Sequence, residues 1–411
     1  MAAIQSSIVE TVGSLVHEPR TTNNASATTP TAANNNNDST HLFIHVGPVK
    51  TGSTSIQCNL QVNPFLKVDS YYFLGKMDRQ CAPTKHRLVR PQKEFMHVQA
   101  FVFQYIKRGW FQQEVHLPYR QSFIEEMNQR NRHGIQTILS GEEFCGILGL
   151  PDDLFQLFAN LLDELEQEVT FQVVYRDFFE WAVSRYSFYE LWHFPVDKFQ
   201  GRSMASILDD KAVDVFAVAN TKACSPHDIW AYFNSKLPAF RKKVRVEVFN
   251  MHGEGDVGNR YVCSLPNAQN ACEASMKNLH LGTSRPTNMN LLHSDRIAAA
   301  AWKAEMFYNA SMLKTRRREI NQVIQDHVQN HLNSSFIDLP LECLSEEQLE
   351  SLLQVSLRYG EDMLGNDFNA ENMKSKFQKQ IEQKKFCSVN VSAVLLDPDW
   401  QNFLQSERLL G

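Results

Sequence analysis

Residues 47–55, GPVKTGSTS, combine the residue types that proteins use to hold a phosphate group. Gly47 and Gly52 permit tight turns in which consecutive backbone N–H groups converge. Lys50 adds a positive charge, and the hydroxyl groups of Ser53–Ser55 add further donors. The segment follows an apolar run and precedes a predicted helix, so these donors would meet the positive end of a helix dipole. We therefore predict an anion-binding loop here.

A second segment, 176–192, places an arginine and a serine for the same purpose. It follows an apolar run and forms a helical pattern in which apolar residues recur at spacings of three and four. Packing that apolar face inward leaves Arg176 at a strand end and Ser184 two turns into the helix, so both can face the mouth of a sheet. Asp177 and Glu180 have the spacing of a capping box. The guanidinium fork and the hydroxyl predict a second phosphate site.

Apolar runs and helical patterns alternate along the chain, and this order predicts the elements that carry both segments. The expected strands cover 42–46, 135–139, 169–175 and 244–249. The expected helices cover 53–62, 97–108, 151–166 and 178–192. Such alternation is typical of an α/β domain with a mainly parallel central sheet flanked by helices, whose ligands bind at the carboxyl ends of the strands.

Composition sets the organisation of the chain and excludes some functions. Residues 1–40 include a polar stretch of low complexity that cannot offset the entropy of ordering, so we expect a disordered tail. Residues 41–411 are expected to form one domain, with a helical C-terminal part from about 294. The net charge of −5 argues against nucleic acid as the main ligand. No apolar run approaches the roughly 18 residues of a membrane span.

The eight cysteines are too few and too scattered to predict a disulfide scaffold, and none forms a CxxC pair that would indicate zinc. Cys263 and Cys272 flank a turn-rich stretch, SLPNAQNA. They would close a small loop if the protein matures in an oxidising lumen, or remain thiols in the cytosol. The sequence leaves both interpretations open.

A nucleotide-triphosphate P-loop, GxxxxGK[ST], is the first alternative for residues 47–55. Its lysine directly follows the second glycine, whereas Lys50 lies two residues before Gly52, and Ser53 follows that glycine. No apolar strand ending in an aspartate suggests a magnesium site. A P-loop nucleotide kinase is therefore the weaker hypothesis.

The same loop resembles the 5′-phosphosulfate loop of sulfotransferases that use 3′-phosphoadenosine 5′-phosphosulfate (PAPS), which has the pattern PxKxGTT between a strand and a helix. The matching positions are Pro48, Lys50, Gly52, Ser53 and Thr54, with serine at 53 in place of the commoner threonine. The resemblance implies a three-layer, P-loop-like α/β fold.

The second segment is similar to the 3′-phosphate motif of these enzymes, RDPxxRxxSxY. The matching positions are Arg176, Asp177, Ser184 and Tyr186, whereas Phe178 replaces the proline and Trp181 the arginine. Cys263, Cys272 and the following LGTSRP also look like the cofactor-covering loop of Golgi carbohydrate sulfotransferases. The resemblance is specific over about 41–60 and 170–192 and general elsewhere.

The resemblance implies a reaction in which a sulfuryl group passes in line from PAPS to a hydroxyl or amine acceptor without a metal ion. Lys50 would stabilise the leaving phosphate oxygen. The cofactor-binding residues would be Pro48, Lys50, Thr51, Gly52, Ser53, Thr54, Ser55, Arg176, Ser184, Ser284 and Arg285.

The acceptor needs a general base, and the segment SGEEF after the strand at 135–139 offers Glu142 and then Glu143. The alternative is that one of them caps a helix and the other is solvated. His45, His86 and His97 are rival bases, although the position of His45 within a strand favours a satisfied core histidine.

A basic cluster, KHRLVRPQK, lies between the phosphate loop and the next expected strand. Arg87, Arg90 and Lys93 would bind an acidic glycan acceptor, or the cluster is a solvated face. The resemblance favours the Golgi lumen over the cytoplasm and leaves the oligomeric state open. A non-catalytic, cofactor-binding protein on the same fold is the remaining alternative.

Overall fold

The computed structural model of this protein describes residues 40–47, 51–74, 117–141, 147–148, 150–192, 204, 225–277, 341–390, 393, 396–399, 402 and 406. Side chains are described for these residues except 117–119, 187–192 and 389. The chain divides into two units, residues 1–38 and 39–411, and every described residue belongs to the second. The predicted disordered tail therefore lies, apart from Thr40, outside the described residues.

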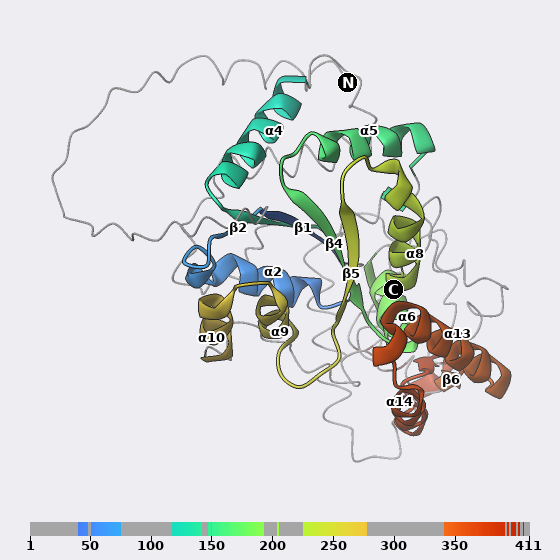
Figure 1. The fold of residues 1–411 in the computed structure, drawn as a ribbon. Coiled ribbons are helices and arrows are strands. Elements are labelled where there is room, and N and C mark those ends of the chain that lie inside the picture. The colour runs from blue at the N-terminus through green and yellow to red at the C-terminus, as the bar shows by residue number, and fades with distance from the viewer. Residues whose placement is uncertain are drawn as a thin grey trace. The chain divides into compact units, whose positions relative to one another are not determined.

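Five parallel strands form the central sheet, in the order β2-β3-β1-β4-β5 (Figure 1). They are β1 (His41–Val46), β2 (Tyr71–Phe73), β3 (Gln136–Ser140), β4 (Glu168–Tyr175) and β5 (Val244–Asn250). The predicted α/β fold with a parallel central sheet is confirmed, and four strands lie within one residue of the expected ranges. The sequence did not predict β2, because three residues are too few to show a strand period.

The helices that flank the sheet have the following bounds. They are α2 (Ser53–Val62), α4 (Leu117–Arg132), α5 (Asp152–Asp163), α6 (Phe178–Trp192), α8 (Pro226–Lys236), α9 (Val257–Ser264), α10 (Gln269–Lys277), α13 (Glu346–Leu364) and α14 (Ala370–Glu382), with single 3₁₀ turns at Pro64–Leu66, Leu237–Ala239 and Gly365–Asp367. The predictions for α2, α5 and α6 are confirmed. The helix expected at 97–108 lies outside the described residues.

Two apolar cores, one on each face of the sheet, give the fold its three layers. Along β1 the side chains alternate, so that Leu42, Ile44 and Val46 enter one core and Phe43 the other. The first core also receives side chains from α4, α5, α6, α8, α13 and α14, and the second from α2, α9 and α10. In Figure 1, α2, α9 and α10 accordingly lie together on one side of the sheet.

The C-terminal part is helical over 346–382, and a small antiparallel pair of strands, β6 (Leu341–Cys343) and β7 (Cys387–Val389), brackets these helices. Ser345 begins α13 with a capping box to Gln348, so the helix start has a local cause. Of the helical patterns expected from about 294, the one at 296–313 lies outside the described residues, and the one at 344–364 forms α13. The strand pair was not predicted.

Every cysteine among the described residues is disulfide-bonded. The bonds include Cys263–Cys272, across the α9–α10 hairpin, and Cys343–Cys387, which joins β6 to β7; Cys58 is bonded as well. The first bond is one of the two outcomes that the sequence left open. The sequence did not predict the Cys343–Cys387 bond, because only the fold brings these cysteines, 44 positions apart, onto paired strands.

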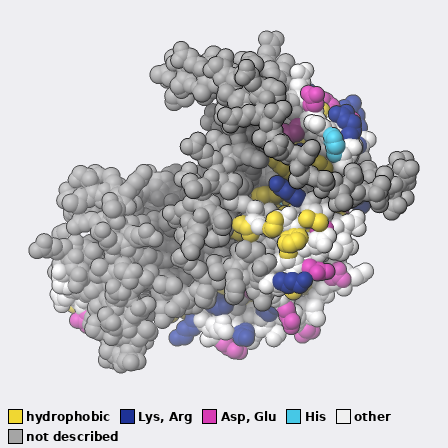
Figure 2. All heavy atoms as spheres, turned by 90° about the vertical axis from the view of Figure 1, so that its left-hand side faces the viewer, with side chains coloured by type: hydrophobic (Ala, Val, Ile, Leu, Met, Phe, Trp, Pro, Cys, Tyr) yellow, Lys and Arg dark blue, Asp and Glu magenta, His cyan; other side chains and the backbone are white. Residues whose placement is uncertain are grey.

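The described surface is mixed in charge. Figure 2 shows acidic and basic side chains interspersed with small apolar areas on the face that carries α2, α4 and α10. Large hydrophobic side chains exposed in the described part of the chain include Phe65, Val68 and Met276. None of the helices in the described ranges is both long enough and apolar enough to cross a membrane.

Candidate anion-binding site

The β1–α2 loop ends at a glycine that the backbone requires. Gly52 is the N-cap of α2 and has φ 78°, a left-handed conformation that side chains disfavour. A Cβ at Gly52 would also lie 3.0 Å from a methyl carbon of Val257. The first turn of α2 contains no acidic residue that would neutralise the positive end of the helix dipole or repel an anion there. These features are compatible with anion binding at the N-terminus of α2, which stays a prediction.

The hydroxyl groups of the loop have different surroundings. Thr51 and Ser53 are buried, whereas Thr54 is exposed on the first turn of α2. The hydroxyl of Ser55 donates to the carboxylate of Asp256, with Oγ 3.1 and 3.3 Å from its two oxygens. Ser55 is thus engaged with the start of α9 in this structure, which sequence reasoning did not foresee.

His45 lies in β1 immediately before the loop and is fully buried. Its Nδ1 lies 2.7 Å from Oγ of Ser140, which also accepts a hydrogen bond from Gln57. Its Nε2 has no hydrogen-bond partner among the described residues. Burial lowers the pKa of His45 from 6.5 to about 3, so the ring is neutral. The core location predicted for this histidine is confirmed, but only one of its nitrogens is satisfied.

Arg176 and Ser184 lie at the junction of β4 with α6. Arg176 directly follows the last residue of β4, as predicted, and its side chain is 21% exposed. Its Nε donates to Glu180 at 3.4 Å. Burial lowers the pKa of Arg176, and the carboxylate of Glu180 opposes that shift, so the guanidinium stays charged. Ser184 is half-buried, two turns into the helix.

The expected capping box at the start of α6 is not formed. The backbone N–H of Asp177 donates to Nε2 of His252 at 2.9 Å, so Glu180 does not receive it. Glu180 instead accepts from Arg176 and from Gln380 of α14. The box does not form because His252, just after β5, accepts the backbone N–H of Asp177, and Gln380 of α14 donates to the carboxylate of Glu180.

Asp177, Glu180 and His252 place ligand atoms within 4.8 Å of one another, which is close enough to suggest a metal site. Lys376 lies 3.3 Å from Asp177, and Arg176 pairs with Glu180, so two cations already balance the two carboxylates. Burial lowers the pKa of His252, and its Nε2 acts as an acceptor. We interpret the group as an ion-pair network that fixes the β4–α6 junction.

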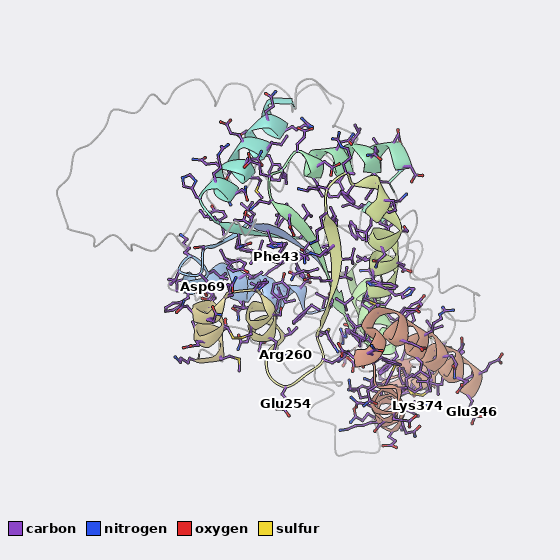
Figure 3. All side chains as sticks on the ribbon, viewed as in Figure 1. Phe43, Asp69, Glu254, Arg260, Glu346 and Lys374 are labelled. Carbon is purple, nitrogen blue, oxygen red and sulfur yellow. A yellow bond between two sulfur atoms is a disulfide. The ribbon has the colours of Figure 1, made fainter. Side chains whose placement is uncertain are left out.

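The α9–α10 hairpin is anchored to α2 by buried polar contacts. Ser275 donates to Asn59 at 2.9 Å, and Asn63 donates to Ser275 at 2.8 Å. At the other end of the hairpin, Asp69 accepts from the backbone N–H of Ala271 at 2.7 Å; Figure 3 shows Asp69 beside α10. The disulfide hairpin therefore supports the helix whose N-terminus is the predicted anion site.

Several predicted site residues lie outside the described part of the chain, so their roles stay predictions. They are Pro48 and Lys50 of the loop, Glu142 and Glu143, the rival bases His86 and His97, Arg87, Arg90 and Lys93 of the basic cluster, and Ser284 and Arg285. β3 ends at Ser140 and pairs in parallel with β1, so the carboxyl ends of these two strands lie side by side.

The loop follows the carboxyl end of β1, and Arg176 follows the carboxyl end of β4. These strands are neighbours in the sheet, with Val46 of β1 opposite Val173 of β4. The two predicted phosphate sites therefore lie on the same side of the sheet, beyond the carboxyl ends of its strands. No family model matches this chain, and comparisons with curated proteins and with solved structures gave no match. What the site can bind follows from its own geometry and from the motifs that it carries.

Proposed function

We propose that this protein is a transferase that binds a nucleotide through phosphate groups at two separate points. The particular activity is transfer of a sulfuryl group from PAPS to a hydroxyl or amine group, with a carbohydrate as acceptor. The observation that carries the proposal is the adjacency of the β1–α2 loop and Arg176 on paired parallel strands.

The spacing of these two elements suits a ligand with two anionic ends. Neighbouring strands lie about 4.8 Å apart, and ligands of parallel sheets bind beyond the carboxyl ends. Arg176 lies three positions beyond Val173, the partner of Val46. PAPS carries phosphate on both the 3′ and 5′ positions of one ribose. The loop would hold the 5′-phosphosulfate, and Arg176 with Ser184 the 3′-phosphate.

A nucleoside triphosphate fits these features less well. A triphosphate is an extended chain of anions that a P-loop lysine follows along one helix terminus. Here Ser53 occupies the position of that lysine, and the arginine at the next strand would have no phosphate to bind.

The proposed reaction relies on placement and charge. The amides at the start of α2 hold the 5′-phosphate, while Lys50 stabilises the charge that develops on the leaving oxygen. Glu142 removes the proton of the acceptor hydroxyl, and Arg87, Arg90 and Lys93 bind an acidic glycan. The disulfides at Cys263–Cys272 and Cys343–Cys387 suit an oxidising compartment such as the Golgi lumen.

Calorimetry tests the cofactor. We expect the full chain to bind 3′-phosphoadenosine 5′-phosphate, the bisphosphate product, and to bind ATP with magnesium at least about 100-fold more weakly. Adenosine 5′-phosphate, which lacks the 3′-phosphate, should bind more weakly than the bisphosphate. Binding of ATP with magnesium but not of the bisphosphate would contradict the proposal and favour a kinase.

A second experiment tests transfer itself. Radiolabelled PAPS is incubated with the protein and with separate glycan, phenol, steroid and peptide acceptors. The proposal predicts label in the glycan fraction. Tight binding of the bisphosphate with no labelled acceptor of any class would identify a non-catalytic, cofactor-binding protein instead.

A further inference from the structure

The unpaired nitrogen of His45 is a buried polar atom at the entrance to the phosphate loop. His45 is the fifth residue of β1, the strand that Figure 3 marks with Phe43. Its ring is held on one side by Ser140 and on another by an edge-to-face contact with Tyr261, at 5.2 Å between ring centroids. The ring therefore has a fixed orientation, and Nε2 points in a defined direction.

That direction is toward the loop. A Cβ placed on Gly47 would lie 3.0 Å from Nε2 of His45 and 3.2 Å from Cβ of Ser53. Nε2 therefore lies against the first residue of the loop, on the side where α2 begins. The side chain has no exposed surface, so a bound anion reaches this nitrogen only when the residues around the start of α2 make room for it.

The hydrogen bonds around Ser140 decide which nitrogen carries the proton. Gln57 donates its amide N–H to Oγ of Ser140 at 3.2 Å. If the hydroxyl of Ser140 then donates to Nδ1 of His45, the amide N–H of Gln57, the hydroxyl of Ser140 and Nδ1 each have a hydrogen-bond partner. The opposite arrangement would leave that buried hydroxyl hydrogen without an acceptor among the described residues. The favoured neutral form of His45 thus has its hydrogen on Nε2.

A buried N–H group without an acceptor costs about 1–3 kcal/mol, so such groups are uncommon unless a ligand completes them. The helix terminus beside it attracts an anion, and an anionic oxygen is the strongest acceptor that can occupy the loop. Two independent features, the start of α2 and the Nε2–H group, therefore favour the same kind of ligand atom.

We infer that the Nε2–H group of His45 donates a hydrogen bond to an anionic oxygen of the ligand held at the start of α2, which makes His45 a ligand-binding residue and not the general base. The identity of that oxygen rests on the proposed function, in which it belongs to the 5′-phosphosulfate of PAPS. Burial keeps the ring neutral before the anion binds, so His45 enters the contact as a neutral donor.

Two amide substitutions separate the roles of the two nitrogens. His45→Asn keeps a polar group near the position of Nδ1, within reach of Ser140, and removes the donor at Nε2. His45→Gln extends an amide N–H toward the position of Nε2. We expect calorimetry with 3′-phosphoadenosine 5′-phosphate to show about tenfold weaker binding by the asparagine variant and near-normal binding by the glutamine variant. Equal affinities for the wild type and the asparagine variant, or equal losses in both variants, would overturn the inference.

A measurement on the wild-type protein avoids any folding defect of the variants. Nitrogen NMR of protein labelled with ¹⁵N-histidine distinguishes the two neutral forms of each ring. We expect the His45 resonances to show hydrogen on Nε2 and to shift when 3′-phosphoadenosine 5′-phosphate is added. Hydrogen on Nδ1, or resonances that do not respond to bound ligand, would exclude the proposed contact.

The same spectra separate this inference from the proposed function. If the wild type binds no bisphosphate, the proposed function fails, and inorganic pyrophosphate is then titrated as a simple anion. A response of the His45 ring to pyrophosphate would support the contact for another anionic ligand. No response to either compound would overturn the inference as well.

Discussion

The hydroxyl of Ser55 donates to the carboxylate of Asp256, which joins the first turn of α2 to the first turn of α9 across 201 positions of sequence. The same carboxylate accepts the backbone N–H groups of Gly258 and Asn259, at 2.8 and 3.1 Å, and so caps α9. Gly258 makes the approach close, because a Cβ there would lie 2.6 Å from the carbonyl oxygen of Ser55. A negative charge is thus fixed beside the helix terminus that we expect to bind an anion.

Asp256→Asn should strengthen anion binding. Asparagine caps a helix about as well as aspartate, so α9 should remain intact, but the variant removes a charge that repels the ligand. We expect about fivefold tighter binding of 3′-phosphoadenosine 5′-phosphate by calorimetry at low salt, and a smaller gain at 0.5 M salt, where charges are screened. As a control, Asp367→Asn removes an acidic residue from the Gly365–Asp367 turn and should change nothing. Weaker binding by the Asp256 variant would show that the carboxylate supports the ligand.

Arg176→Ala and Lys50→Ala should separate binding from turnover. In the proposed function Arg176 binds the 3′-phosphate of the cofactor, so its loss should weaken binding of the bisphosphate by about 100-fold. Lys50 is assigned to charge that develops during transfer, so its loss should lower kcat about 100-fold while the Kd changes little. Arg241→Ala is a matched control, since that side chain is 74% exposed and pairs with Asp163. Near-normal turnover by the Lys50 variant would contradict its role.

Ser356→Ala should destabilise the protein through α6. The hydroxyl of Ser356 accepts the backbone N–H of Phe179, in the first turn of α6, at 3.2 Å and donates to the carbonyl of Leu352 at 2.7 Å. Its loss leaves a buried N–H without a partner, which costs about 1–3 kcal/mol. Urea denaturation measures the difference in the free energy of unfolding. Ser235→Ala, which removes a comparable but exposed serine on α8, should cost less than about 0.5 kcal/mol; equal losses would count against a capping role for Ser356.

The two described disulfides should differ in their effect on stability. Cys343–Cys387 spans 44 positions and Cys263–Cys272 spans 9, and a longer closed loop restricts the unfolded chain more. Replacing each pair by serine should cost about 4 and about 2.5 kcal/mol of unfolding free energy, respectively, by the chain-entropy relation. Urea denaturation under non-reducing conditions measures both. A larger loss at the shorter bridge would show that the α9–α10 hairpin carries stability beyond its loop closure.

His45 should make stability depend on pH. Its pKa is lowered to about 3 in the folded protein from 6.5 when unfolded, so below pH 6.5 the unfolded chain binds the extra proton. This contribution to stability is complete above pH 6.5 and declines as pH falls toward 3, by about 1.4 kcal/mol per pH unit. His45→Gln lacks the titrating ring, so its unfolding free energy should fall less steeply between pH 6 and 4. Parallel profiles for the two proteins would contradict this assignment.

The sequence predicted those parts of the fold whose causes are local. The apolar run before Gly47 and the glycine at 52 set the end of β1 and the start of α2, and the helix bounds were predicted to the residue. Arg176 was placed at a strand end because apolar residues run up to it and a helical period follows. Such signals lie within a dozen residues of the feature that they specify.

The rest of the candidate site depends on residues far apart in sequence. His252 follows an edge strand, β5, and approaches Asp177 only because β5 pairs with β4. Lys376 reaches the same carboxylate from α14, some 200 positions later. The half-satisfied state of His45 depends on Ser140 in the neighbouring strand. No local sequence pattern predicts such pairings. The one local signal is the position of His252 just after a predicted strand, where a polar side chain can lie at the carboxyl ends of the strands.

The contacts between α6 and the C-terminal helices have a consequence for biosynthesis. The ring of Phe178 packs edge-on against Tyr359, and that of Phe179 against Phe377, while the first turn of α6 depends on Ser356. During translation, β1 to β5 leave the ribosomal exit tunnel long before residue 356 does. The segment next to Arg176 therefore completes its packing only near the end of translation, and the site matures after the sheet that supports it.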